Sequence, residues 1–311
     1  MADLPKRTLG RTGFEATVLG YGAMELRDKP RGREVSEEDA ARILNAALDS
    51  GINFVDTSID YGISEERIGR HISHRRDEYF LASKCGCLVG WEPTEEKGGP
   101  HEYNRDNIVK GVEQSLTRLK TDRLDLVQVH MTPSKKVLEE NNVVETLKDL
   151  QQQGKVRFIG MSGTIPNLAD HIAMGVFDAF QIPYSAIQRE HEDLVSEAAK
   201  SGAGIIIRGG AGRGTPSGDE RARERSMDLA SVWDRTNMDD LLQGMSPMEF
   251  TLRFTISHPD MTTTIVGTLN PAHLAGNIEA IQKGPLPKDL YEEAKRRLAE
   301  AGTAPVPAGA R

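Results

Sequence analysis

Four polar residues with complementary chemistry follow three apolar segments of the chain. They are Asp56 after INFV, Tyr61 five residues later, Lys84 after YFLAS, and His130 after LDLVQV. A phenol is a weak acid at neutral pH, but a neighbouring ammonium group stabilises tyrosinate and lowers the phenol pKa. An aspartate would pair with that ammonium, and a histidine would donate a hydrogen bond to an oxygen that gains negative charge. Together these groups suit proton transfer to a carbonyl oxygen while hydride reaches the carbonyl carbon.

Each of these residues also has an ordinary explanation. An aspartate after a strand often caps a turn, a histidine often satisfies a structural hydrogen bond, and a tyrosine often packs in the core. Lys84 has a second chemical explanation, because a lysine with a lowered pKa can form a Schiff base in a lyase or aldolase. Asp56 argues against this alternative, since a nearby carboxylate keeps the lysine charged.

The elements that would position these residues alternate along the chain. Short β-branched or apolar segments are separated by longer amphipathic ones, which is typical of βαβ units and a parallel sheet. Because eight such pairs occur in strict alternation, we predict a single α/β domain over residues 1–311, a closed (β/α)8 TIM barrel, in preference to an open doubly wound sheet. The predicted strands are 16–20, 52–55, 79–83, 124–129, 156–161, 177–182, 204–208 and 262–266.

The predicted helices have recognisable start and stop signals. Ser36, Ser64 and Asn104 each precede an amphipathic segment, as an N-cap residue does. Glycines occur where several helices should end. Further helices are predicted at 143–153, 165–174, 189–200, 247–257 and 271–281.

Three segments lie outside this repeat. RTLGRTGFEA, near the N-terminus, contains a turn and predicts a hairpin that covers the bottom of the barrel. Long loops are expected after the third and seventh strands, at 90–103 and 214–240. Such loops commonly contact substrates, although the charged second loop also has the composition of solvated surface. Residues 303–311 are rich in Pro, Ala and Gly and predict a flexible tail.

The composition limits the class of protein. Hydrophobic residues make up 38% and charged residues 28% of the chain, which suits a globular protein with a sizeable core. The net charge is −8 and no long basic run occurs, so binding to nucleic acids or to anionic membranes is not expected. We expect a cytoplasmic protein, because no secretion signal or membrane-spanning apolar stretch is visible.

The two cysteines predict no metal or redox chemistry. Cys85 and Cys87 are too close in sequence for an unstrained disulfide, and the chain lacks the second cysteine pair of a typical zinc site. We therefore expect two ordinary thiols beside a strand end and no metal site.

Several further residues would share one end of the barrel with the first four. A TIM barrel carries its chemistry at the C-terminal ends of its strands. The later strands end at Ser162, Gln181, Arg208 and Gly267-Thr268. The loops around this mouth would supply walls of a substrate pocket from Trp91, Met131 and Trp233.

Several motifs, in their order along the chain, resemble those of the aldo-keto reductase superfamily. They are NFVDTSIDYGISEERIG, the lysine of LASKCG, DLVQVH and GKVRFIGMSG, and the resemblance extends over nearly the whole chain. It implies that Asp56, Tyr61, Lys84 and His130 form a catalytic tetrad, with Tyr61 as general acid and base. It also implies an NAD(P)H-dependent oxidoreductase that reduces a small aldehyde or ketone to an alcohol, or catalyses the reverse reaction.

The same resemblance implies NADP as the cofactor, with NAD as the alternative, extended across the barrel mouth. The glycines of GGAGRG do not match the G-x-G-x-x-G fingerprint, so no Rossmann unit is expected. Ser162 and Gln181 would hold the nicotinamide amide, and Arg208 would stack on its ring. The other implied cofactor contacts are Gly22, Ala23, Met24, Gly212, Arg213, Gly214, Gly267, Thr268, His273 and Asn277, together with Asp56.

Three departures from the family pattern concern the cofactor. Gly163 follows Ser162 where an asparagine is common, and no aromatic residue follows the seventh strand. The segment 267–277 carries no Lys or Arg for a 2′-phosphate, so the sequence does not decide between NADP and NAD. These departures motivate a third hypothesis, a cofactor-bound barrel with a regulatory and not a catalytic role. The sequence determines neither the substrate nor the oligomeric state.

Overall fold

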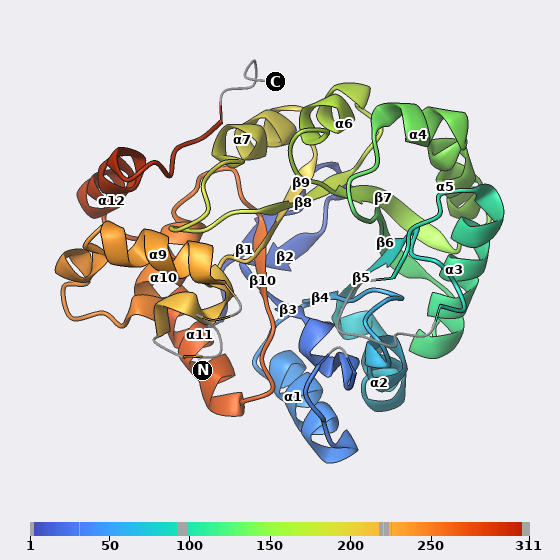
Figure 1. Ribbon diagram of the computed structural model, residues 1–311. Helices are drawn as coiled ribbons and strands as arrows, with labels where there is room; N and C mark the ends of the chain where they lie inside the picture. Colours follow the sequence, from blue (N-terminus) through green and yellow to red (C-terminus); the bar gives the residue numbers. More distant parts are fainter. Residues whose placement is uncertain are drawn as a thin grey trace.

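The barrel predicted from the sequence is present. The computed structural model describes residues 3–30, 32–91, 99–217, 220, 224 and 226–306. Parallel strands close into a barrel in the order β10-β3-β4-β5-β6-β7-β8-β9, with helices around it (Figure 1). The barrel strands are β3 Leu19–Gly22, β4 Phe54–Asp56, β5 Phe80–Cys85, β6 Leu124–Val129, β7 Val156–Ser162, β8 Ala179–Pro183, β9 Gly204–Arg208 and β10 Thr263–Val266.

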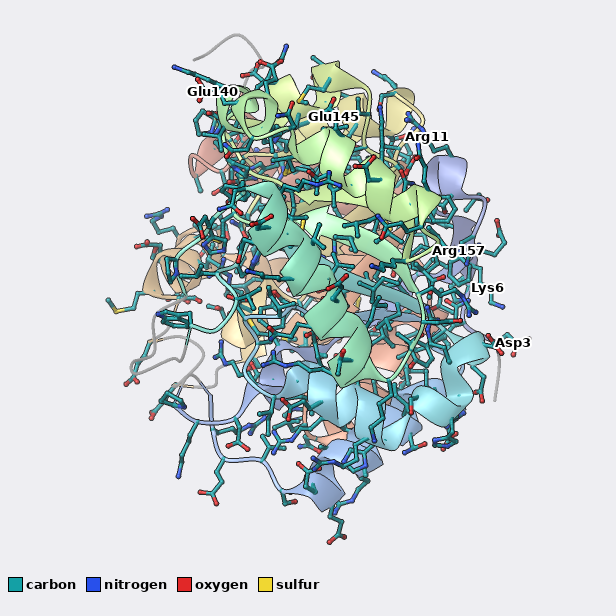
Figure 2. The ribbon with its side chains drawn as sticks, turned by 90° about the vertical axis from the view of Figure 1, so that its right-hand side faces the viewer. Asp3, Lys6, Arg11, Glu140, Glu145 and Arg157 are labelled. Carbon is teal, nitrogen blue, oxygen red and sulfur yellow. The ribbon has the colours of Figure 1, made fainter. Side chains whose placement is uncertain are left out.

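The N-terminal hairpin covers one end of the barrel. Strands β1 (Lys6–Thr8) and β2 (Glu15–Thr17) pair antiparallel, so the predicted strand 16–20 is divided between this hairpin and β3. Phe14 packs on Phe80, with ring centroids 4.7 Å apart at the start of β5. In Figure 2, Lys6 and Arg11 lie at the same end of the molecule as Arg157, near the start of β7. The hairpin therefore closes the end opposite the expected site.

Most helices begin and end close to the predicted positions. The side chains of Ser36 and Asn104 accept capping hydrogen bonds, as predicted. Ser64 instead lies inside its helix, and its hydroxyl bonds Ala23 O and Thr57 Oγ1, so the predicted cap is wrong. The helices are α1 Glu37–Asp49, α2 Ser64–His71, α3 Arg105–Leu119, α4 Lys135–Glu140, α5 Val143–Gln152, α6 Leu168–Met174, α7 Glu192–Lys200, α9 Met227–Arg235, α10 Pro247–Ile256, α11 Pro271–Gln282 and α12 Lys288–Glu300, with 3-10 helices η1 Gly10–Thr12, η2 Ala23–Arg27, η3 Ser73–Glu78, η4 Gly212–Ser217 and η5 Met238–Leu241.

The two predicted long loops follow β5 and β9. The second is not simply an open loop, because η4, α9 and η5 occupy much of it. The tail is also partly held, since Val306 N donates to Glu190 O, while residues 307–311 lie outside the described residues. No helix in the described part of the chain has the length and apolar character needed to cross a membrane.

Side chains inside the barrel change from apolar to polar along β4, β5, β6, β8 and β9. Residues two apart on a strand share a face. The inward apolar layer contains Phe54, Phe80, Ala82, Leu126, Ala179 and Ile206, which pack with Leu9 and Ala16 of the hairpin region. Two residues further along these strands are Asp56, Lys84, Gln128, Gln181 and Arg208. The alternation therefore places a polar layer at the C-terminal end, above a closed apolar plug.

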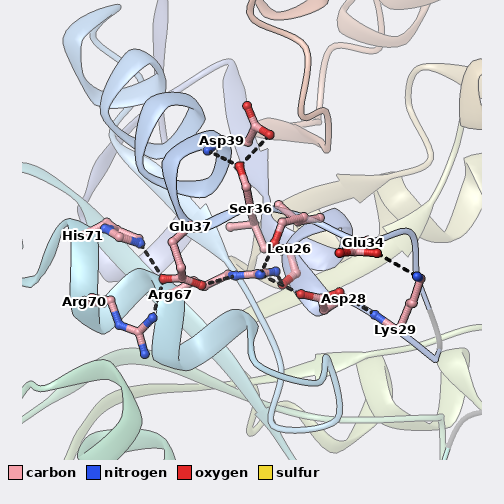
Figure 3. A network of polar contacts seen from close by, with 11 residues as sticks. Leu26, Asp28, Lys29, Glu34, Ser36, Glu37, Asp39, Arg67, Arg70 and His71 are labelled. Carbon is pink, nitrogen blue, oxygen red and sulfur yellow. Dashed lines mark hydrogen bonds and ion pairs between the residues drawn. The ribbon is translucent and has the colours of Figure 1, made fainter.

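A buried arginine fixes the segment that leaves β3 (Figure 3). Arg67 of α2 is 3% exposed and donates to Leu26 O, Asp28 Oδ2, Val35 O and Glu37 Oε1. These bonds join η2, the following loop and the start of α1 to α2. The hydrogen bonds of Arg67 therefore hold η2, the segment that contains Ala23 and Met24, against α2.

Glu37 gives this network a measurable pH dependence. Partial burial opposes its charge, but hydrogen bonds from Arg67, His71 and Arg70 lower the pKa of Glu37 from 4.5 to about 2. A carboxyl with a lowered folded-state pKa stabilises the fold above its unfolded pKa and loses this contribution as pH falls. We expect the difference in unfolding free energy between wild type and Glu37→Gln, measured in urea, to shrink between pH 4.5 and about 2.

Glu38→Gln is the matched control for this experiment. The Glu38 carboxylate is 86% exposed and pairs with the half-exposed Arg42 at 3.1 Å, so a small difference is expected at every pH. A difference for Glu37→Gln that stays constant across the acid range would contradict the assigned role of the network.

Candidate active site

A buried ion pair lies at the centre of the polar layer. Lys84 Nζ lies 2.7 Å from Asp56 Oδ2 and donates a second bond of 2.7 Å to Thr57 O. The lysine and aspartate side chains are 1% and 2% exposed. Asp56 ends β4 and Lys84 lies near the end of β5, the neighbouring strand, so the barrel register brings the two together.

Two amide groups hold the other oxygen of Asp56. Gln128 Nε2 and Gln181 Nε2 donate to Asp56 Oδ1 over 2.9 and 2.8 Å. Gln128 was not predicted as a site residue from the sequence. It lies two residues after Leu126 on β6 and therefore points to the same inward face. Both carboxylate oxygens of Asp56 are therefore satisfied inside the barrel.

The ion pair keeps Lys84 protonated. Burial by itself would lower the pKa of Lys84, but the negative charge of Asp56 and its hydrogen bond raise this pKa above the ordinary value. A Schiff-base lysine needs a lowered pKa to act as a nucleophile. The environment of Lys84 therefore opposes the lyase alternative.

Tyr61 lies above this pair. Lys84 Nζ is 4.9 Å from the centroid of the Tyr61 ring. The turn that carries the tyrosine requires a glycine, because Gly62 has φ of +50° and a Cβ there would lie 2.1 Å from Arg27 O. Gly62 therefore allows the Tyr61 turn to pack against η2, the segment that Arg67 anchors.

The pKa of Tyr61 differs from the simple sequence expectation. Burial raises this pKa and outweighs the opposing effect of Lys84, while Asp56 and Asp60 raise it further. The predicted lowering by Lys84 is thus present but is not the net result. Tyr61 is a protonated phenol at neutral pH in this structure.

His130 lies beside Tyr61 and is neutral. The two rings meet edge to face with centroids 6.4 Å apart. Burial lowers the pKa of His130 to about 3, against an opposing effect of Asp60. A hydrogen bond of 2.7 Å from Tyr103 Oη to His130 O holds its backbone. At neutral pH His130 therefore acts as an uncharged hydrogen-bonding group.

Cys87 contacts two imidazole rings, which the sequence analysis did not anticipate. Its Sγ lies 3.2 Å from His130 Nδ1 and 3.5 Å from His101 Nε2. The side-chain ligand atoms of these three residues all lie within 4.8 Å of one another. The expectation of ordinary thiols without a metal stays a prediction for Cys87, whereas Cys85 packs in the hydrophobic core.

The residues predicted at the first and last barrel strands converge. A Cβ at Gly267 would lie 2.6 Å from Gly22 O, so the chain after β10 passes close to the end of β3. Tyr21 Oη donates to Thr268 O over 3.0 Å and joins the same two segments. Met24 is exposed beside them. On α11, His273 is exposed and Asn277 is buried.

The loop after β9 has an unusual backbone, and the last residue of β9 has a buried nitrogen without a hydrogen bond. Gly212, Arg213 and Gly214 all have positive φ, of 58°, 55° and 78°. Arg208 Nε is buried and has no hydrogen-bond partner among the described residues. Burial also lowers the pKa of Arg208. A cavity of about 380 Å³ beside Arg213 is lined by Gln188, Glu224 and residues 226–229, and it does not include the group around Lys84.

The two side chains predicted to hold the nicotinamide amide, Ser162 and Gln181, form hydrogen bonds within the protein. Gln181 donates to Asp56, and its Oε1 accepts a long bond of 3.4 Å from Ser162 Oγ. Gly163 N donates to Gln181 O and continues the pairing of β7 with β8. Gln181 therefore orients Asp56, a role that the sequence analysis did not assign to it.

The three predicted pocket residues have different environments. Met131 is 62% exposed at the end of β6, and the half-buried Trp91 ring lies against Gly99. Trp233 is only 4% exposed, packs against Phe250 and donates to Asp239, so its burial argues against a pocket wall. In the described part of the chain, the large exposed apolar side chains are Met24, Met131, Ile165 and Met227, all in segments that follow barrel strands.

A family comparison covers most of the chain. The model of the aldo/keto reductase family matches residues 18–297. The chain belongs to the aldo/keto reductase family. Membership of this family and the similarity to oxidoreductases identify the protein as a carbonyl-reducing oxidoreductase.

Individual relatives cover most of the chain at modest identity. The uncharacterized oxidoreductase YqkF of Bacillus subtilis is 27% identical over 288 residues, 88% of this chain and 90% of that protein. L-galactose dehydrogenase of Arabidopsis thaliana is 25% identical over 300 residues, 90% of this chain and 89% of that protein. The holo-form structure of aldo-keto reductase AKR11C1 from Bacillus halodurans matches the fold with a TM-score of 0.82, 24% identity and coverage of 99% and 100% of the two chains.

Proposed function

We propose that this protein is an NAD(P)H-dependent aldo-keto reductase in which Tyr61 is the general acid for carbonyl reduction and the general base for the reverse reaction. The observation that carries the proposal is the buried Lys84–Asp56 pair with its ammonium 4.9 Å from the Tyr61 ring centroid. Because two charges are costly to bury, such a pair needs further hydrogen bonds, which Gln128 and Gln181 donate to Asp56 and which Thr57 O accepts from Lys84.

The loop after β9 fits an anionic cofactor. Gly212, Arg213 and Gly214 all have positive φ and form a tight turn, in which Gly212 N and Gly214 N donate to Gly209 O and Ala211 O. The buried Nε of Arg208 and the buried hydroxyl of Thr215 lack partners among the described residues. Arg213 and Thr215 would hold the pyrophosphate of NADP, Arg208 would stack on the nicotinamide ring, and the segments at Gly22–Met24 and Gly267-Thr268 would line the cofactor channel.

The residues that would contact the adenosine end of the cofactor do not favour NADP over NAD. Thr268 and Asn277 are buried and His273 is exposed, but none carries a permanent charge. A 2′-phosphate would therefore need a cation from another segment. We propose NADP as the cofactor, with NAD as the alternative, and comparison of kcat/KM for NADPH and NADH decides between them.

Tyr61 is suited to donate a proton to the carbonyl oxygen. The bound reduced nicotinamide would supply hydride to the carbonyl carbon. Burial raises the pKa of Tyr61, so the phenol holds its proton at neutral pH until charge develops on the substrate. The nearby ammonium of Lys84 then stabilises the tyrosinate, and Asp56 keeps that ammonium in place.

His130 would orient the carbonyl group. Its Nδ1 faces Cys87 and Asp60, which leaves Nε2 as the nitrogen that meets the substrate. A neutral ring, with a pKa lowered to about 3, donates a hydrogen bond without adding a full charge. Exposed Met24 and Met131 would contribute apolar contacts around the substrate.

The proposed activity can be tested with a carbonyl panel. Purified protein is mixed with NADPH or NADH and with simple aldehydes, ketones and sugars, and nicotinamide absorbance is followed. Sugars belong in the panel because one relative is an L-galactose dehydrogenase. We expect aldehyde or ketone reduction, and alcohol oxidation with the oxidised cofactor.

Two results would favour the alternatives. Tight dinucleotide binding without turnover in either direction would support a cofactor-bound regulatory barrel. A stable borohydride-trapped adduct on Lys84 would support a Schiff-base lyase, against the raised pKa of that lysine.

A further inference from the structure

Cys87 and His101 are held on one face of a small antiparallel bridge. The backbones of these two residues pair directly. Leu88 N donates to Pro100 O, and Glu102 N donates to Gly86 O, on either side of the pair. Residues directly opposite in an antiparallel pair place their side chains on the same face. The thiol and the imidazole therefore meet because of backbone geometry.

Asn107 of α3 fixes this bridge from behind. Its Nδ2 donates to Cys87 O over 3.1 Å and to Glu102 O over 2.7 Å, while its Oδ1 accepts from Val89 N over 3.0 Å. His130 reaches the same thiol from the end of β6, and His130 N donates to Cys85 O. Three separate segments thus place one sulfur and two ring nitrogens together.

The separations between the sulfur and each of the two ring nitrogens match those of a tetrahedral metal site. Zinc binds thiolate sulfur at about 2.3 Å and imidazole nitrogen at about 2.0–2.1 Å, which gives a tetrahedral S···N separation of about 3.5 Å. The observed separations from Cys87 Sγ are 3.2 Å to His130 Nδ1 and 3.5 Å to His101 Nε2. One thiol and two imidazoles are also a donor set that zinc prefers over magnesium or calcium.

We propose that Cys87, His101 and His130 bind one divalent ion of the zinc class. The fourth position would be taken by solvent or by Asp60, whose Oδ1 lies 3.9 Å from His130 Nδ1. Binding replaces the thiol proton of Cys87, which leaves to solvent, with a sulfur–metal bond. The buried Asp60 carboxylate, 7% exposed, would offset the positive charge that remains.

Metal binding would also define the state of His130. With the metal on Nδ1, the ring proton lies on Nε2. This consequence rests on the proposed function, in which Nε2 of His130 donates to the substrate. The metal site itself does not depend on catalysis.

Cobalt(II) spectroscopy tests the site directly. Protein freed of any affinity tag, treated with a chelator and desalted is titrated with CoCl₂, and then with ZnCl₂. We expect one Co²⁺ per chain, a thiolate-to-cobalt charge-transfer band in the near ultraviolet, visible bands of tetrahedral intensity, and loss of all bands as Zn²⁺ displaces Co²⁺.

Three variants separate this site from adventitious binding. Cys87→Ala should remove the charge-transfer band, and His101→Gln should weaken Co²⁺ affinity at least about tenfold, since even groups that only orient a metal ligand contribute that much. Cys85→Ala is the matched control, because Cys85 faces the hydrophobic core two residues away, and it should keep the wild-type spectrum.

Two outcomes would overturn the proposal. One is the absence of a thiolate band in wild-type protein at saturating Co²⁺, which would leave only a hydrogen-bonded thiol. The other is a band that persists in Cys87→Ala. A protein that binds Co²⁺ as expected but turns over no carbonyl compound would contradict the proposed function alone.

Discussion

Tyr61→Phe is expected to lower kcat for carbonyl reduction by about 10²–10⁴-fold, because the substitution removes the proposed proton donor and retains the ring. The phenol is protonated at neutral pH, since burial raises its pKa, and Lys84 lies close enough to stabilise the anion that forms. Steady-state kinetics with NADPH and the best aldehyde of the panel measure the loss. Cofactor affinity, followed by fluorescence, should change little.

Tyr79→Phe is the matched control for this variant. Tyr79, just before β5, is also a buried tyrosine, but among the described residues its hydroxyl makes only a long bond of 3.4 Å, to Ile72 O. The kcat of the Tyr79→Phe variant should stay near that of wild type. If Tyr61→Phe reduced the aldehyde at the wild-type rate, proton delivery would have to be assigned to another group.

Lys84→Met is expected to destabilise the protein by about 3–5 kcal/mol, because it leaves the Asp56 carboxylate buried without its cation. The two amides on Asp56 Oδ1 cannot neutralise that charge. Urea denaturation with linear extrapolation measures the change. The double variant Lys84→Met with Asp56→Asn should lose less stability than Lys84→Met, since the uncompensated charge is removed.

Lys136→Met is a control for the loss of a lysine charge in general. Lys136 pairs with Glu140 at 3.6 Å on the exposed face of α4, and pairs of this kind contribute about 0–1 kcal/mol. Equal losses for Lys84→Met and Lys136→Met would show that the buried pair is not essential to the fold. If the double variant Lys84→Met with Asp56→Asn were as unstable as Lys84→Met, the loss of stability would come from packing and not from the uncompensated charge.

Much of the fold was predictable because its signals are local. Seven of the predicted barrel strands, from 52–55 to 262–266, match observed ones within a few residues, since apolar alternation and flanking turns depend only on neighbouring residues. The strand at 16–20 was misjudged because one apolar run serves both the hairpin and β3. Helix α12 was not predicted, although its amphipathic sequence carried the signal.

The sequence by itself determined the types of the four reactive groups and their places at or after the ends of three strands. Period-two alternation then implies that Asp56 and Lys84 point into one barrel, because each lies two residues beyond an inward apolar side chain. The same rule could have found Gln128. The hydrogen bond from Gln128 to Asp56 was not predictable, since these residues lie 72 positions apart in the sequence.

Only the tertiary structure decided how these groups are surrounded. Burial makes the net pKa shift of Tyr61 upward, turns Trp233 into a core residue and engages Gln181 with Asp56. A local antiparallel bridge also brings His101 to Cys87, and the pairing of β5 with β6 brings His130 there. Desolvation and contacts of this kind depend on every segment packed around a residue, so they arise from the closed fold and not from local sequence.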